Sequence, residues 1–238
     1  MDQTRRFQQL AGVSCLLAAT CYVGGAVLMA AAVSFNLSLD AFSSTMIAVG
    51  PRGAELLRWG LMLDGLGSYL LLAPLALYLW GWLKPENPNL ANLYTLSGLG
   101  YMLVGAIGAF VLAAALPPLV NAYGAASAAQ RETLQVVFNT IFNAVYRGLW
   151  NPLEVLLLAA WLLGLGPWIA RTRPALGRLT QLVGLSALLD AAGRFLGLEP
   201  LFMVGVSVLL ALLPLWLLWW GIELLRRLPR TAGDAGAS

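Results

Sequence analysis

The sequence predicts an all-α protein, a polytopic bundle of transmembrane helices with six spans. Long apolar stretches follow one another along the 238 residues, of which 60% are hydrophobic and only 11% charged. A soluble domain carries roughly 25% charged residues. A helix needs about 20 mostly apolar residues to cross the hydrocarbon core of a bilayer. The expected spans are residues 8–33, 55–83, 91–119, 150–170, 175–197 and 200–225.

These spans account for nearly the whole chain, so we expect one membrane domain, residues 1–228, and a polar cytoplasmic tail, residues 229–238. Span 1 is interpreted as a retained helix. Its apolar run is longer than the 7–15 residues of a signal-peptide core.

The distribution of basic residues predicts the orientation. With six crossings, nine of the 14 basic residues fall on one side: Arg5, Arg6, Lys84, Arg171, Arg173, Arg178, Arg226, Arg227 and Arg230. The positive-inside rule makes that side cytoplasmic, with both termini on it. Tryptophans near the same ends of spans 2, 4 and 6 fit the headgroup level: Trp80, Trp82, Trp168, Trp219 and Trp220. We therefore expect a multi-pass protein of the bacterial inner (plasma) membrane.

The first three spans have recognisable ends. After span 1, Ser38 and Asp40 can cap a short helix on the outer surface, which Gly50-Pro51 ends. Residues 84–89, with two prolines, separate spans 2 and 3. In span 3, Gly105, Ala109 and Ala113 share one smooth face for helix packing.

The second half contains a long helical pattern. Pro117-Pro118 is expected to end span 3, and residues 121–130 to form a loop. From residue 131 to 170 the pattern is helical, about 60 Å if unbroken, so a break is expected at Asn151-Pro152. The part before that break either lies at the outer interface or packs into the bundle. Span 5 is the least apolar, and its Gly193 and Gly197 are interpreted as packing positions.

A polar stripe marks the long helical pattern. Steps of four or three residues place its members on one helix face: Gln135, Asn139, Asn143, Arg147, Asn151 and Glu154. The residues between them are almost all apolar. The stripe faces either a polar cavity in the bundle or, if the helix is interfacial, bulk water.

Further ionisable residues lie within the spans. A charge at membrane depth costs about 2.5–3.5 kcal/mol on insertion scales, so such residues usually pair or face water. By the topology above they belong to the outer half, and the arginines can balance the carboxylates. The hypothesis is an outward-facing polar pocket; the alternative is an ion-pair network that holds helix register. The candidate ligand-binding residues are Arg58, Asp64, Asn139, Asn143, Arg147, Asn151, Glu154, Asp190 and Arg194.

Several functions fit this pocket. Binding of a small amphipathic molecule or lipid headgroup is favoured, with arginines for an anion and asparagines for orientation. A small-solute or proton-coupled transporter and an accessory subunit of a larger membrane complex are the alternatives. An enzyme is disfavoured, because neither a nucleophile motif nor a metal-ligand cluster occurs and the chain has no histidine. No cofactor is identified. The expected partners are the bilayer, such a ligand and membrane subunits, but not nucleic acid.

The chain as a whole resembles the uncharacterised bacterial families of small six-span membrane proteins, which are domains of unknown function. The resemblance rests on Arg5-Arg6-Phe7, the Lys84-Pro85 break, the long helix around 143–154 and the Arg173–Gly177 entry to span 5. It implies a membrane bundle and carries no functional residue over.

Overall fold

The computed structural model describes residues 3–35 and 42–226, and all the regular structure in these ranges is helical. The elements in order are α1 (Gln3–Ala32), α2 (Phe42–Ile47), α3 (Gly50–Asp64), the π-helix η2 (Gly65–Tyr69), the 3₁₀ turn η3 (Leu70–Leu72), α4 (Ala73–Leu83), α5 (Pro88–Ala125), α6 (Ala128–Asn143), the π-helix η4 (Ala144–Glu154), α7 (Val155–Thr172), α8 (Pro174–Leu196) and α9 (Glu199–Arg226).

Five helices are long and apolar enough to cross a membrane: Gln3–Ala32, Gly50–Leu83, Pro88–Ala125, Ala128–Thr172 and Glu199–Arg226. The protein is therefore a multi-pass membrane protein in contact with lipid. The predicted span 175–197 does form a helix, α8, of 23 residues. It is not among the five, and its Gln181, Asp190 and Arg194 make it less apolar than they are.

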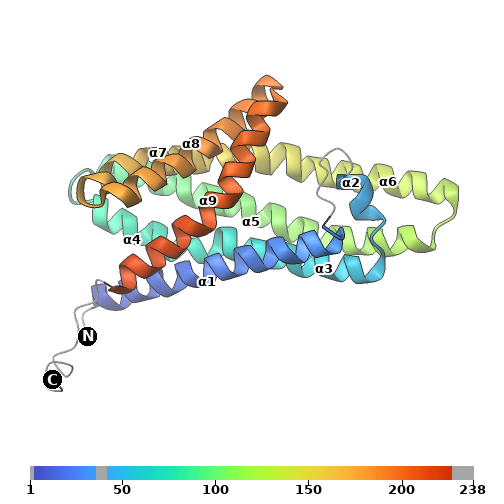
Figure 1. Ribbon diagram of the computed structural model, residues 1–238, viewed down its shortest axis with the longest axis horizontal. Coiled ribbons are helices and arrows are strands. Elements are labelled where there is room, and N and C mark those ends of the chain that lie inside the picture. The colour runs from blue at the N-terminus through green and yellow to red at the C-terminus, as the bar shows by residue number, and fades with distance from the viewer. Residues whose placement is uncertain (1–2, 36–41, 227–238) are drawn as a thin grey trace, which may run out of the picture.

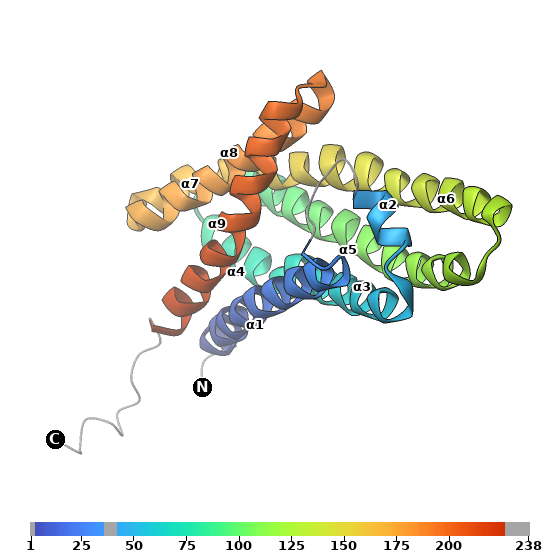
Figure 2. The ribbon, with the colours of Figure 1, turned by 45° about the vertical axis from the view of Figure 1, so that its right-hand side comes forward.

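The long helices run side by side along the long axis of the molecule, and α9 crosses them obliquely (Figure 1). The start of α1 and the end of α9 lie together at one end, here called the terminal end. The turn between α5 and α6 lies at the opposite end, the far end. From the terminal end, α1 and α9 diverge, so that the start of α9 stands well away from α1 (Figures 1 and 2).

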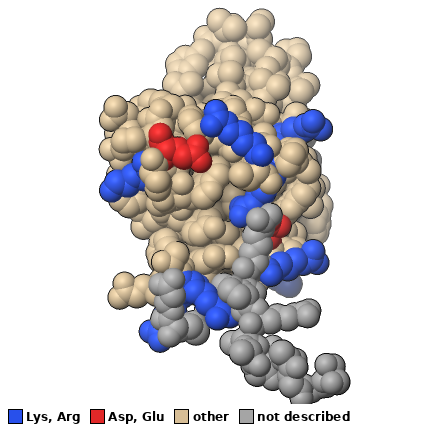
Figure 3. Space-filling view, turned by 90° about the vertical axis from the view of Figure 1, so that its left-hand side faces the viewer, with Lys and Arg blue, Asp and Glu red and all other residues tan. Residues whose placement is uncertain are grey.

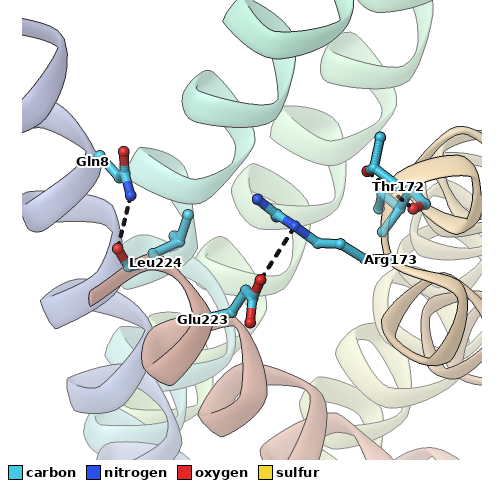
Figure 4. Close-up of polar contacts among 6 residues, drawn as sticks. Gln8, Thr172, Arg173, Glu223 and Leu224 are labelled. Carbon is cyan, nitrogen blue, oxygen red and sulfur yellow. Dashed lines mark hydrogen bonds and ion pairs between the residues drawn. The ribbon is translucent and has the colours of Figure 1, made fainter. Parts of the chain in front are cut away.

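Polar contacts fasten the terminal end (Figure 4). Gln8 Nε2 on α1 donates a hydrogen bond of 2.8 Å to the carbonyl of Leu224 on α9. Arg173, between α7 and α8, forms an ion pair of 3.3 Å with Glu223 of α9. Gly12 lets α1 approach this part of α9, because a Cβ there would lie 2.9 Å from Leu225. Helix α9 is thus held from both sides at its last turns.

Aromatic rings fill the core toward the terminal end. The rings of Trp161 and Trp216 lie 6.0 Å apart, and those of Trp216 and Trp220 lie 6.5 Å apart, both edge to face. All three side chains are fully buried. Trp220, which the sequence places at the headgroup level, therefore belongs to this core. Such rings bury large apolar areas and prefer this geometry.

The predicted end of span 3 is wrong. Pro117 and Pro118 lie inside α5, which continues to Ala125, so the predicted loop 121–130 shrinks to the two residues before α6. Leu116 and Val120, on either side of the prolines, are fully buried. Their packing against neighbouring helices offsets the hydrogen bonds that the prolines remove.

The predicted break at Asn151-Pro152 is an irregularity within one continuous helix. Residues 128–172 form a single 45-residue helix, and 144–154 adopt π-helical pairing. Asn151 Nδ2 donates a 2.8 Å hydrogen bond to the carbonyl of Tyr146, and the wider turn of the π-helix accommodates the proline. The helix can therefore pass through Pro152 without a break.

Two other expectations are modified. Gly193 packs against Phe202 as expected. Gly197 instead caps α8 with a φ of +67°, and a Cβ there would meet no atom within 4 Å, so its role is conformational. Helix α2 occupies part of the predicted outer helix. The proposed caps Ser38 and Asp40, and the tail 229–238, lie outside the described residues.

A pair of glycines tests the packing of α7 against α8. A Cβ on Gly177 would lie 2.5 Å from the Cα of Ala170, whereas one on Gly81 meets nothing within 4 Å. We expect Gly177→Ala to destabilise the folded protein by about 1–3 kcal/mol, since backbone must move. Gly81→Ala should leave it unchanged or stabilise it by up to about 1 kcal/mol. Thermal unfolding of both variants in detergent measures this, and equal midpoints would contradict the packing.

Candidate functional site

A cavity of about 480 Å³ lies inside the bundle, lined by residues of α1, α2, α3, α5, α6, α7, α8, α9 and both π-helical segments. It extends from Tyr69 and Tyr101 toward Met46 and Phe142 near the far end. Most of its wall is apolar. Its polar lining residues are Tyr22, Asp64, Ser68, Tyr69, Tyr101, Tyr146, Trp150, Asn151, Glu154, Asp190 and Ser207.

The two π-helices place polar side chains on this wall. Segment η2 contains Ser68 and Tyr69 and directly follows Asp64, and segment η4 contains Asn151 and Glu154. A π-helix widens the turn and shifts the register of the side chains around it, and such segments are frequent at functional sites. Here the two segments are in direct contact, because Tyr69 of η2 hydrogen-bonds to Glu154 of η4.

Glu154 is the central polar group. Its side chain is only 7% exposed, and Tyr69 donates a hydrogen bond of 3.0 Å to its Oε1. Its Oε2 is buried and accepts no hydrogen bond from the described residues. Gly105 of α5 makes room for the Tyr69 ring, because a Cβ there would overlap that ring. One carboxylate oxygen is thus held in place and the other is unpartnered.

Asp64 and its neighbours form a second polar group. Ser68 Oγ donates a 2.5 Å hydrogen bond to Asp64 Oδ1, one turn earlier in the chain. Tyr101 donates to the backbone carbonyl of Ser68 at 2.9 Å, and its ring lies 5.3 Å from that of Tyr69. These contacts tie α5 to the π-helix beside Asp64.

Asp190 approaches from α8. It is 1% exposed, and its Oδ1 accepts no hydrogen bond from the described residues. Helix α9 passes close behind it, because a Cβ on Gly205 would lie 2.8 Å from the Cα of Asp190. Close approach of the two backbones leaves little room for Asp190 to turn away from the cavity.

Four of the nine candidate residues line the cavity: Asp64, Asn151, Glu154 and Asp190. The other five lie elsewhere. Asn139 and Asn143 are half-buried on α6, and Asn139 accepts a hydrogen bond of 3.3 Å from Gln135. The polar stripe is thus divided: its last two members reach the cavity and the earlier ones do not.

The three predicted arginines are also outside the cavity. Arg147 is exposed. Arg58 pairs with Glu55 at 4.0 Å, beside a separate hollow between α3 and α5. Arg194 pairs with Glu199 at 3.7 Å and lies over the ring of Phe202. The expected balance of arginines and carboxylates inside one pocket is therefore absent from the described lining.

The sequence reasoning missed the tyrosines. Four of the seven in the chain line the cavity: Tyr22, Tyr69, Tyr101 and Tyr146. A signal existed, since tyrosines in membrane helices concentrate at the interfaces. Tyr22, Tyr69 and Tyr101 lie well inside the predicted spans, which indicates a polar partner within the bundle.

The acidic residues are spread over the wall. No three His, Cys, Asp or Glu side chains in the described ranges are grouped closely enough to hold a metal ion. The site is thus an apolar chamber with separate carboxyl groups and tyrosine rings, suited in shape to an organic molecule.

Comparisons with known proteins give one result. Neither the curated proteins nor the solved structures contain a match to this chain. A family model for a domain of unknown function, DUF4386, matches residues 10–226. This match covers the bundle from the first turns of α1 to the end of α9, and the chain therefore belongs to the DUF4386 family.

Proposed function

We propose that this protein binds a small amphipathic molecule in the cavity between the π-helices. The observation that carries the proposal is the pair of buried, unpartnered carboxylate oxygens on the cavity wall, Glu154 Oε2 and Asp190 Oδ1. A buried polar atom without a partner costs about 1–3 kcal/mol, and more when charged. A ligand that pairs with them would remove this cost, and the apolar remainder of the wall would hold its apolar part.

Binding is favoured over transport by the terminal half of the bundle. A transported solute needs a route to both sides, but Trp161, Trp216 and Trp220 fill the core between the cavity and the terminal end. All three are fully buried. A chamber closed at one end fits a protein that holds a ligand rather than one that passes it through.

The proposal includes six crossings, with α8 as the fifth. Helix α8 turns its polar side chains inward: Asp190 lines the cavity and Thr180 is buried. The exposed positions in its middle turns are leucines, with Leu182, Leu185 and Leu188 between 37% and 53% exposed. A helix with this pattern suits a place between protein and lipid, and its lower hydropathy reflects residues that lipid does not meet.

We assign the terminal end to the cytoplasm. Lys and Arg side chains gather around this end, with fewer acidic ones (Figure 3). Lys84 lies over the ring of Trp80 at 4.3 Å, and Arg171 over that of Trp168 at 4.0 Å. Basic and aromatic side chains together are typical of the cytoplasmic interface. The cavity then belongs to the outer half of a plasma-membrane protein.

The angle between α1 and α9 provides a way in for the ligand. Tyr22 donates a hydrogen bond of 3.2 Å to the carbonyl of Leu210 where the two helices part. Beyond that point Met29 of α1 and Met203 and Ser207 of α9 line the cavity. Leu210 is 57% exposed. This side faces lipid, so a membrane-dissolved molecule can reach the chamber without crossing water.

The first test is native mass spectrometry of the protein purified in mild detergent. We expect wild type to carry a small molecule or lipid, and Glu154→Gln to carry roughly tenfold less, since the acceptor Oε2 is replaced by an amide NH₂ while the hydrogen bond from Tyr69 is kept. Arg147→Ala is the matched control, because Arg147 is exposed outside the cavity, and should keep the ligand. Equal retention by a folded Glu154→Gln would contradict the site.

The orientation is tested by labelling single cysteines in a background without Cys15 and Cys21. Cysteine at Ala126, in the turn between α5 and α6, should react with an impermeant maleimide in intact cells. Cysteine at Glu86, between α4 and α5, should react only after the cells are permeabilised. The reverse pattern would invert the topology, and equal reactivity would remove the crossing by α5.

The route between α1 and α9 is tested by bulky substitutions on α9. Ser207→Trp fills the cavity wall, and we expect it to lower ligand occupancy at least about tenfold, because the ring occupies the space that the ligand needs. Val204→Trp is the control on the same helix: Val204 is 55% exposed and does not line the cavity. Equal occupancy in both variants would place the entrance elsewhere.

A further inference from the structure

We infer that the ligand is an organic cation with an apolar body, an inference that rests on the proposed binding function. The reason is the chemical character of the cavity wall. It presents acceptors of hydrogen bonds and aromatic ring faces, while most of its donors are engaged within the protein. This goes beyond the anion or headgroup that the arginines of the sequence suggested.

Most of the polar side chains of the wall already donate to acceptors within the protein. Tyr22 donates to Leu210, Tyr69 to Glu154, and Tyr101 to the carbonyl of Ser68. The same holds for Trp150, whose indole nitrogen donates to the carbonyl of Gly105 at 3.2 Å, and for Asn151, which donates to Tyr146. An anion would need donors, and these would have to leave their present acceptors.

The charges point the same way. Asp64, Glu154 and Asp190 come from three different helices to one cavity, and none of the described lining residues is basic. Arg58 forms an ion pair with Glu55, and Arg194, which lies beside the cavity 5.5 Å from the ring of Tyr146, forms one with Glu199. Several carboxyl groups around an apolar space repel one another when ionised, and a single cation between them relieves this repulsion.

The rings provide the second attraction. Tyr69 and Tyr101 lie against each other at 5.3 Å with an angle of 59° between their planes, at the closed end of the cavity. A cation near the face of an aromatic ring gains roughly 0.5–2 kcal/mol, most where water is excluded. Tyrosines beside carboxylates thus suit an ammonium or phosphonium group.

The size and spacing favour an organic cation over a metal ion. A calcium ion takes six to eight oxygen ligands at about 2.3–2.6 Å, and magnesium takes six at about 2.1 Å. The described acidic residues are not grouped in this way. A chamber of about 480 Å³ with a mostly apolar wall matches a molecule of several rings or a branched chain.

The test uses two probes of nearly the same size and opposite charge, the tetraphenylphosphonium cation and the tetraphenylborate anion. Binding to the full-length protein in detergent is measured by equilibrium dialysis against protein-free micelles, which corrects for partition into detergent. We expect the cation to bind wild type at least about tenfold more tightly than the anion. Comparable or tighter binding of the anion would overturn the inference.

Two variants locate the effect. Glu154→Gln and Asp190→Asn remove charge with little change of shape, and each should weaken binding of the cation at least about tenfold. The control Glu132→Gln removes an exposed carboxyl group on α6 outside the cavity and should have no effect. Circular dichroism and size-exclusion profiles establish that each variant is folded.

The outcomes separate the two proposals. If the anion binds and Ser207→Trp blocks it, the cation inference fails and the binding function stands. If neither probe binds and wild type carries no molecule in native mass spectrometry, both fail. If the cation binds equally well to all the carboxyl variants, the charge is not recognised by Glu154 or Asp190 and the inference is wrong.

Discussion

The structure depends on one constraint: a carboxyl group, Glu154, lies buried among apolar helices and needs a partner there. In a bilayer, water does not supply one, so neighbouring helices or a ligand must. Tyr69 of η2 supplies a hydrogen bond to one of the two carboxyl oxygens of Glu154. This bond joins the two π-helices. The second oxygen remains without a partner among the described residues.

Small residues on α5 make the arrangement sterically feasible. Gly105 lies against the Tyr69 ring, and Gly108 against Trp150, where a Cβ would lie 2.9 Å from the indole Cδ1. Ala109 is fully buried beside them. The smooth face of α5 therefore does more than bring helices close. It holds the rings in the orientation in which their hydroxyl and indole hydrogens reach acceptors, which leaves the cavity poor in donors.

The sequence predicted much of the fold because the apolar character of a membrane helix extends over its whole length. The boundaries of α1, α8 and α9 lie close to the predicted spans. The irregularity lies around Asn151-Pro152, where a break was predicted because the helical pattern is too long for one span.

The site was harder to predict from the sequence than the fold. Asp64, Glu154 and Asp190 stood out as charges at membrane depth, but the arginines did too, and one-dimensional spacing cannot tell which face a π-helix turns inward. Glu55 and Glu199, the ion-pair partners of Arg58 and Arg194, lie three and five residues from them, whereas Asp190 of the cavity lies four residues from Arg194. Spacing along the chain could therefore not predict that Arg194 pairs with Glu199 at 3.7 Å, or that no described lining residue is basic.

The two halves of the bundle differ because α9 is oblique. At the terminal end, Gln8, Arg173 and the aromatic core hold α9 against α1 and the α7–α8 turn. Beyond Tyr22 the helices part, and residues of α9 that would otherwise pack on α1 line the cavity. A rigid, filled half thus acts as the base from which α8 and α9 project. Since α8 carries Asp190 and α9 backs it through Gly205, the distance between Asp190 and Glu154 is set by the tilt of this pair. A ligand that bridges the two carboxyl groups would therefore contact the α8–α9 pair and η4 at once.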